Sequence, residues 1–141
     1  MNIPNGAYHL DTLMRAGFIG RSQGGALGAG LHGEEGGFSN DKLREVSGTV
    51  STMPKTYEQS GLGDAAVAHL HYFLAGFDWY ITERDMEPEQ HQAHGLAIFQ
   101  HVGPDGGELG YISLYEITDL GAELDLHFTP TNLGEIRRRL R

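Results

Sequence analysis

The stretch "FDWYITERD", from Phe77 to Asp85, decides the fold because it reads as a half-buried strand that ends in charge. Its side chains alternate with the two-residue period that places neighbours on opposite faces of a sheet. One face carries Phe77, Trp79 and Ile81, and the other carries Asp78, Tyr80 and Thr82. We expect the first face to form the core, with Trp79 largely buried. The end from Glu83 to Asp85 has two interpretations: it marks where the strand leaves the core, or it projects charge toward a site.

Four further strands are predicted around this one. They are "VAHLHYFL" (67–74), "GLAIFQHV" (95–102), "ELGYISL" (108–114) and "AELDLHF" (122–128), with a turn at "GPDGG" between the second and the third. In the strand at 67–74, His69 and His71 alternate onto one face. Two capping boxes, Ser113 with Glu116 and Asn132 with Glu135, predict short helices after the strand at 108–114 and at the C-terminus.

The N-terminal part is predicted to be helical and rich in glycine. Leu10, Leu13 and Met14 have helical spacing, and Gly17 can end that helix. A second helix is expected after Ser39 or Asn40 and before Gly48. The glycines between 20 and 37 predict a mobile loop, and "GAGLHG" at 28–33 lacks the preceding strand of a dinucleotide site.

Together these elements predict one α+β domain over residues 1–141. Residues 1–52 form its helical, glycine-rich part, and residues 53–141 carry a mostly antiparallel sheet of about five strands with short helices. The chain shows no apolar run long enough to cross a membrane, no signal peptide and no cysteine, which favours the cytoplasm.

Charge is distributed unevenly. The net charge is −9, yet from Glu58 to Glu135 fourteen acidic residues face a single base, Arg84, which gives −13. This argues against direct binding of nucleic acid, whose phosphates need a basic surface, and permits binding to a basic partner. A solvated acidic surface without a specific partner is the simpler alternative. The candidate partner-binding residues are Asp78, Glu83, Asp85, Glu87, Glu89, Glu108, Glu123 and Asp125.

His69 and His71 are also candidate metal ligands, because two imidazoles at this spacing can share a zinc ion. His101 and His127 are candidates for a third ligand. The alternative is that both are partly buried histidines of the sheet. No Ser, His and acid arrangement typical of a hydrolase is visible, and no catalytic residue is predicted.

Four stretches carry a family resemblance: "MPKTYEQSGLGD", "FDWYITERD", "GGELGYISLYEI" and "ELDLHFTPTNLGEI". In order and spacing they resemble the family catalogued as domain of unknown function 2958, over about residues 53–136. The chain departs from that family at Leu124, between Glu123 and Asp125, where the family commonly has arginine. The resemblance implies an accessory protein of a plasmid, an integrative element or a phage, and supplies no catalytic residues.

From charge and resemblance together we expect a non-catalytic binding protein of a mobile genetic element. Its partner would be a protein, such as a nucleic-acid-handling host complex, which it inhibits as a counter-defence (anti-CRISPR) protein through an acidic surface that mimics nucleic acid. The alternative is a metal-dependent hydrolase that uses His69 and His71 with zinc.

Overall fold

The computed structural model of the chain describes residues 6–31, 36–99 and 107–140. Its helices are α1 (Gly6–Ala16), α2 (Arg21–Gly30), α3 (Gly36–Thr52), the 3-10 turn η1 (Gly63–Ala65), α4 (Leu114–Asp119) and α5 (Leu133–Arg139). Its strands are β1 (Val67–Ala68), β2 (Leu70–Leu74), β3 (Phe77–Glu83), β4 (Ala93–Phe99), β5 (Glu108–Ile112), β6 (Glu123–Leu124) and β7 (Thr131–Asn132). The α+β prediction is confirmed. Among the described residues, no helix is long and apolar enough to cross a membrane.

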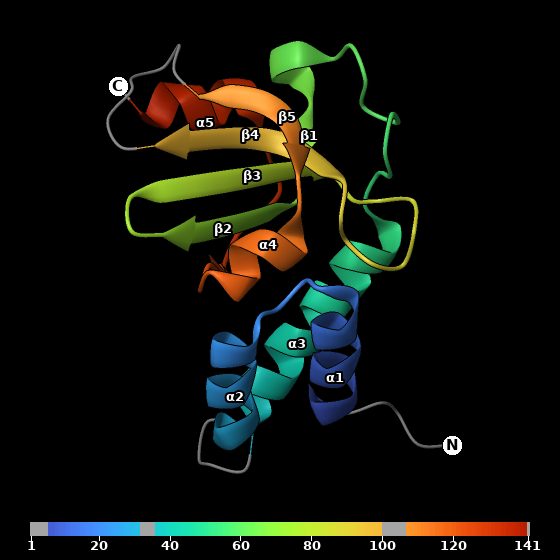
Figure 1. Ribbon diagram of the computed structural model, residues 1–141, viewed down its shortest axis with the longest axis vertical. Helices are drawn as coiled ribbons and strands as arrows, with labels where there is room; N and C mark the ends of the chain where they lie inside the picture. The colour runs from blue at the N-terminus through green and yellow to red at the C-terminus, as the bar shows by residue number, and fades with distance from the viewer. Residues whose placement is uncertain (1–5, 32–35, 100–106, 141) are drawn as a thin grey trace.

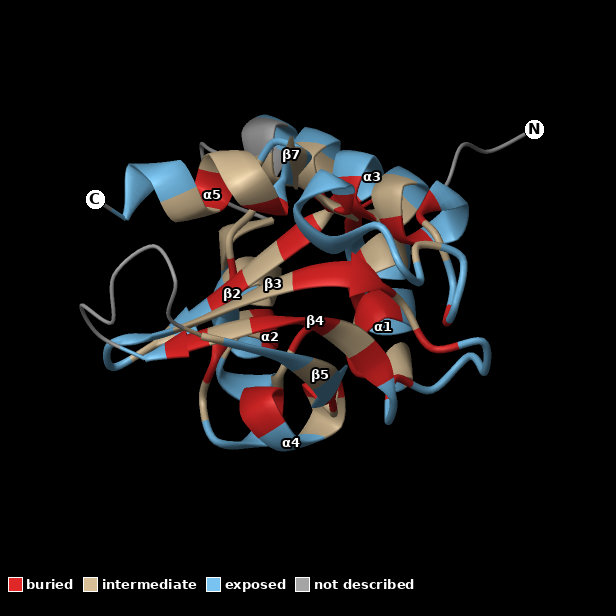
Figure 2. Cartoon of the chain, turned by 90° about the horizontal axis from the view of Figure 1, so that it is seen from above, coloured by how far each residue is buried: buried red, intermediate tan, exposed pale blue. Residues whose placement is uncertain are grey.

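The main sheet has five antiparallel strands in the order β5-β4-β3-β2-β6. It occupies the upper half of the view in Figure 1, and the three N-terminal helices lie together below it. Helices α4 and α5 lie on opposite sides of this sheet (Figure 2). On the α4 face, Leu70, Tyr72 and Ile81 join a core that also contains the N-terminal helices. On the α5 face, Leu96 and Ile98 pack with Leu133 and Ile136. The strand predicted at the start of "FDWYITERD" is β3, which pairs with both β2 and β4.

Burial along β3 runs opposite to the expected direction. Phe77 is 40% exposed, whereas Glu83, at the charged end, is 4% exposed. Trp79, which was expected to be largely buried, is partly buried against the core and stacks on Phe77, with ring centroids 5.4 Å apart. The aromatic start of the strand therefore lies at the open end of the sheet, and the charged end lies against the rest of the chain.

A β-bulge in β3 changes the direction of Glu83. Ile81 pairs with Gly95, but Glu83 pairs with His94, so one extra residue of β3 lies between two consecutive pairs. Cross-strand partners share a face of the sheet, and Gly95 and His94 are neighbours on opposite faces. Ile81 therefore points to the α4 face and Glu83 to the α5 face. A Cβ on Gly95 would lie 2.1 Å from the carbonyl oxygen of Tyr80, so this close approach of β3 requires glycine.

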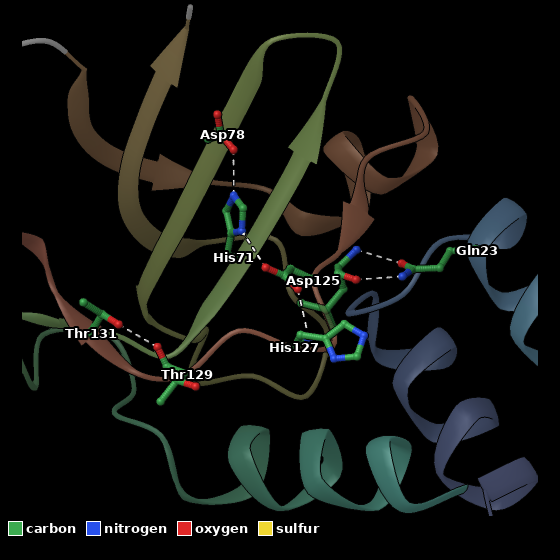
Figure 3. A network of polar contacts seen from close by, with 8 residues as sticks. Gln23, His71, Asp78, Asp125, His127, Thr129 and Thr131 are labelled. Atoms are coloured by element: carbon green, nitrogen blue, oxygen red, sulfur yellow. Dashed lines mark hydrogen bonds and ion pairs between the residues drawn. The ribbon is translucent and has the colours of Figure 1, made fainter. Parts of the chain in front are cut away.

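The strand predicted at 67–74 is divided. Val67 and Ala68 (β1) pair with β7 in a separate two-stranded sheet, and only Leu70–Leu74 (β2) joins the main sheet. The strand predicted at 122–128 is reduced to β6. There Gln23 of α2 takes the place of a neighbouring strand, since its amide donates to the carbonyl of Leu124 and accepts from the Leu124 N–H, both at 2.8 Å (Figure 3). The predicted turn at 103–107 lies mostly outside the described residues.

The glycine-rich segment contains a helix, which corrects the prediction of a loop. Residues 21–30 form α2, and residues 32–35 lie outside the described part of the chain. The glycines permit close packing: a Cβ on Gly24 would lie 2.5 Å from the sulfur of Met14 in α1. Helix α3 also starts earlier than expected and continues through Gly48, and Asn40 accepts a hydrogen bond from the N–H of Gly6 at 2.6 Å instead of capping its own helix.

Both predicted helix starts are confirmed, with the N-cap bond of each predicted box in place. The Ser113 hydroxyl accepts from the Glu116 N–H at 3.2 Å, and the Asn132 side chain accepts from the Glu135 N–H at 2.8 Å. Gly17, with φ of +91°, follows the end of α1 as predicted.

Candidate functional site

The eight acidic residues predicted to bind a partner do not share one surface. Asp78, Glu123 and Asp125 lie on or beside the α5 face, Glu108 pairs with Ala97 on the opposite face, and Glu87 and Glu89 are exposed in the loop between β3 and β4. Glu83 and Asp85 are buried, at 4% and 9% exposure. The expectation that these two project charge into solvent is therefore wrong, and each has a different environment.

Two of these carboxylates hold the predicted metal ligand His71 (Figure 3). The His71 Nδ1 lies 3.1 Å from Asp125 and its Nε2 lies 2.7 Å from Asp78, while the ring stacks on Tyr80 at 4.5 Å between centroids. A neutral imidazole donates from one nitrogen only, so its tautomer decides which of the two carboxylates accepts from the ring. Burial, together with Asp78, raises the pKa of Tyr80 to about 12. The sequence analysis selected all three residues of the network but not their association.

The zinc prediction meets a specific obstacle in this network. A metal needs a free ring nitrogen, and both nitrogens of His71 already face carboxylates. Burial lowers the pKa of His69, which favours its neutral ring. Within residues 6–31, 36–99 and 107–140, no three His, Asp or Glu side chains are grouped to hold an ion, and His101 lies outside these ranges.

Asp85 organises the loop after β3. Its two carboxylate oxygens accept from the N–H groups of Glu87 and Gln92, at 3.1 and 2.9 Å. Gln90, which is fully buried, accepts from the Asp85 N–H at 2.8 Å and donates to the carbonyls of Glu87 and Pro88. Asp85 therefore has a structural role in this loop and is not available to a partner.

Glu83 anchors the segment that follows Met53. Its Oε1 accepts from the Tyr57 N–H at 2.9 Å and its Oε2 accepts from the Gln59 N–H at 2.7 Å. Tyr57 has φ of +77°, a conformation that costs a non-glycine residue about 1–3 kcal/mol and is frequent at functional sites. The Gln59 side chain also holds this segment against the strands. It donates to the carbonyls of Val67 and Thr82 and accepts from the Val67 N–H.

These contacts enclose a pocket of about 260 Å³ on the α5 face. Glu83 and Thr82 of β3, His94 of β4 and Tyr111 of β5 line it, together with Leu133 and the loop from Tyr57 to Gly63. Tyr57 and Tyr111 are 65% and 55% exposed, and the Tyr111 hydroxyl donates to the Tyr57 hydroxyl at 3.2 Å. This hydrogen bond is the main cause of the raised pKa of Tyr111. The His94 ring meets Tyr111 edge-on, at 5.6 Å between centroids.

The pocket combines a buried carboxylate with two exposed phenol rings. Among the described residues Glu83 has no ion-pair partner within 4.0 Å, so its charge is balanced only by two backbone N–H groups. A carboxylate can accept about four hydrogen bonds, so it retains capacity for a further donor. Aromatic faces attract cations. This arrangement is suited to holding a small organic cation.

Comparisons with known proteins identify no relative: no protein-family model matches the chain, and neither the curated proteins nor the solved structures contain a match. The resemblance to domain of unknown function 2958 thus has no support from these comparisons. The assignment of the Glu83 pocket as a binding site is therefore based on its geometry.

Sequence reasoning included Glu83 among the candidates but missed Tyr57, Gln59, His94 and Tyr111. These residues come from three separated segments, which only the folded sheet brings together. One signal was available in Gly95, because a glycine inside a predicted strand indicates a bulge or a close backbone approach.

Proposed function

We propose that this protein is a binding protein that recognises a positively charged group of a protein partner in the Glu83 pocket. The observation that carries the proposal is the Glu83 carboxylate, 4% exposed, in a pocket wall without an ion-pair partner among the described residues. A buried charge is costly unless it is paired and hydrogen-bonded. A cation from a partner would complete this environment.

Tyr57 and Tyr111 add selectivity for a cation. Both exposed residues line the pocket, and a cation within about 6 Å of a ring centroid gains about 0.5–2 kcal/mol. A guanidinium group can stack on a phenol ring while it donates to a carboxylate. We therefore propose arginine, with lysine as a weaker ligand, as the recognised side chain.

The size of the pocket and the charge of the chain point to a macromolecular partner. A volume of about 260 Å³ accommodates the end of one side chain and is smaller than typical sites for drug-sized ligands, about 300–1,000 Å³. The net charge of −9 would accelerate the approach of a basic protein. A nucleic-acid-handling host complex would fit that description, but this identity, the mobile-element origin, the inhibitory counter-defence role and the cytoplasmic location remain predictions from sequence.

The metal-dependent hydrolase remains the alternative, and it requires a rearrangement. A ring nitrogen of His71 would have to leave Asp78 or Asp125 before zinc could bind. No described contact favours that change, whereas the Glu83 pocket can receive a cation as it stands.

The test of ligand class uses two peptides of equal shape, Gly-Arg-Gly and Gly-citrulline-Gly, titrated calorimetrically. The citrulline side chain keeps the planar end group without the charge. We expect saturable binding of the arginine peptide and at least about tenfold weaker binding of the citrulline peptide, since a hydrogen bond to a charged group contributes about 1.5–3 kcal/mol. Equal affinities, or no binding of either peptide, would contradict a cation site.

A further inference from the structure

Arg84, next to Glu83, points to a second site on the other side of the sheet. Because neighbouring residues of an extended chain face opposite ways, the Arg84 side chain is directed away from the Glu83 pocket. Its backbone is fixed, since its N–H donates to the Pro54 carbonyl at 2.9 Å and its carbonyl accepts from the Thr56 hydroxyl at 3.3 Å. The side chain lines a pocket of about 390 Å³ between α1, α3 and the loop after β3.

The Arg84 guanidinium has no ion-pair partner within the described part of the chain. Its Nε is buried and has no hydrogen bond, and among the described residues Arg84 forms no ion pair within 4.0 Å. It is also the only Lys or Arg between Lys55 and Arg137. An unsatisfied buried donor is costly, and more so when it is charged. An acceptor from outside the chain would remove that cost.

The rest of the pocket is mainly apolar. Its wall contains Leu13, Ala16, Phe18, Val50, Met86 and Pro88. The hydroxyls of Thr12 and Ser51, which also line it, donate to backbone carbonyls of their own helices. Arg84 is thus the charged donor of a site that otherwise offers apolar contact.

We propose that this pocket binds a monocarboxylate carried on a short apolar group. The carboxylate would accept from the Arg84 guanidinium, whose buried Nε–H would turn toward the ligand on binding, and the apolar body would contact Leu13, Phe18 and Val50. Phosphate is disfavoured because it has no apolar body and carries a higher charge into an acidic protein with Glu87 and Glu89 in the neighbouring loop. The site is independent of the Glu83 pocket, so either can fail alone.

The experiment titrates the full-length protein with octanoate, 1-octanol, octylamine and inorganic phosphate while the Arg84 Nε–Hε resonance is followed by NMR. That resonance is assigned by its loss in Arg84→Lys. We expect octanoate to shift it saturably and to bind at least about tenfold more tightly than 1-octanol, because only the carboxylate makes the charge-assisted bond. Octylamine and phosphate should leave it unchanged.

Two variants separate the contribution of the Arg84 charge to octanoate binding from that of an arginine outside the pocket. Arg84→Met should weaken octanoate binding at least about tenfold, and Arg44→Met, at an exposed arginine of α3, should leave it within about twofold of wild type. If Arg84→Met does not fold, the four titrations of the wild-type protein are sufficient to test the proposal. An unmoved Nε–Hε resonance, equal binding of octanoate and 1-octanol, or equal binding of phosphate would overturn it.

Discussion

Replacing Gly95 with alanine is expected to lower the free energy of unfolding by about 3 kcal/mol or more, the upper part of the range for overpacking a buried position. The new Cβ would lie 2.1 Å from the Tyr80 carbonyl oxygen and 2.9 Å from the Ile81 Cα. Both are backbone atoms of the central strand, so no side-chain rotation relieves the overlap. Urea unfolding followed by circular dichroism measures the effect.

Gly110→Ala is the matched control. Gly110 is the β5 partner of Gly95, and a Cβ there would meet no atom within 4 Å. We expect this substitution to change stability by less than about 1 kcal/mol, because only the backbone entropy of a strand glycine changes. If the two substitutions have equal effects, the close approach of β3 to Gly95 is not a determinant of stability. The same bulge directs Glu83 to the α5 face. The folded fraction of the Gly95→Ala protein should therefore also bind the arginine peptide more weakly than wild type.

Replacing Gln90 with leucine is expected to cost about 3 kcal/mol. Gln90 is fully buried, and leucine would remove one acceptor and two donated hydrogen bonds. The Asp85 N–H and two loop carbonyls would lose these partners, and each buried unsatisfied group costs about 1–3 kcal/mol unless water replaces the bond. Besides urea unfolding, limited proteolysis should show faster cleavage between residues 86 and 92.

Gln92→Leu provides the comparison for that loop. Gln92 is exposed, and its contact with Asp85 uses its backbone N–H, which the substitution retains. The free energy of unfolding of the Gln92→Leu protein should stay within about 0.5 kcal/mol of wild type, as is usual for substitutions at surface positions. A Gln90→Leu protein as stable as the Gln92→Leu protein would show that the Asp85–Gln90 contacts do not hold the loop.

Local signals predicted much of the fold. The helix starts at Ser113 and Asn132 are encoded within four residues, and the strands at 77–83 and 108–112 were located from local pattern, although burial does not alternate along them. These features are set by neighbours along the chain, so sequence reasoning could locate them. The glycine-rich helix α2 was missed because its glycines serve packing against Met14 of another helix, and helix propensity does not record that contact.

The candidate site was harder to predict because it depends on the bulge. An unbroken strand would place Ile81 and Glu83 on one face. Exposed acid at 83 and 85 was predicted because the run of charge was interpreted as the point where the strand leaves the core. The inserted residue turns Glu83 toward His94 and Tyr111, and the loop at Tyr57 then covers it. Periodicity detects neither a one-residue insertion nor the return of a segment more than twenty positions away.

The central claim is that the Glu83 carboxylate binds a cation, and the most direct measurement is the affinity of Gly-Arg-Gly for Glu83→Gln compared with Glu87→Gln. Both substitutions remove one negative charge, but Glu87 is exposed in the loop after β3. Tyr111→Leu, measured alongside, removes one ring and keeps the Glu83 carboxylate.

We predict at least about tenfold weaker binding for Glu83→Gln, since the charged acceptor is lost, and a change of less than about twofold for Glu87→Gln, since exposed charges contribute little at physiological salt. The affinity of the Tyr111→Leu protein for the arginine peptide should lie between those of the other two variants. Circular dichroism before each titration establishes that the variant is folded. A folded Glu83→Gln protein that binds the arginine peptide as tightly as wild type would contradict the account.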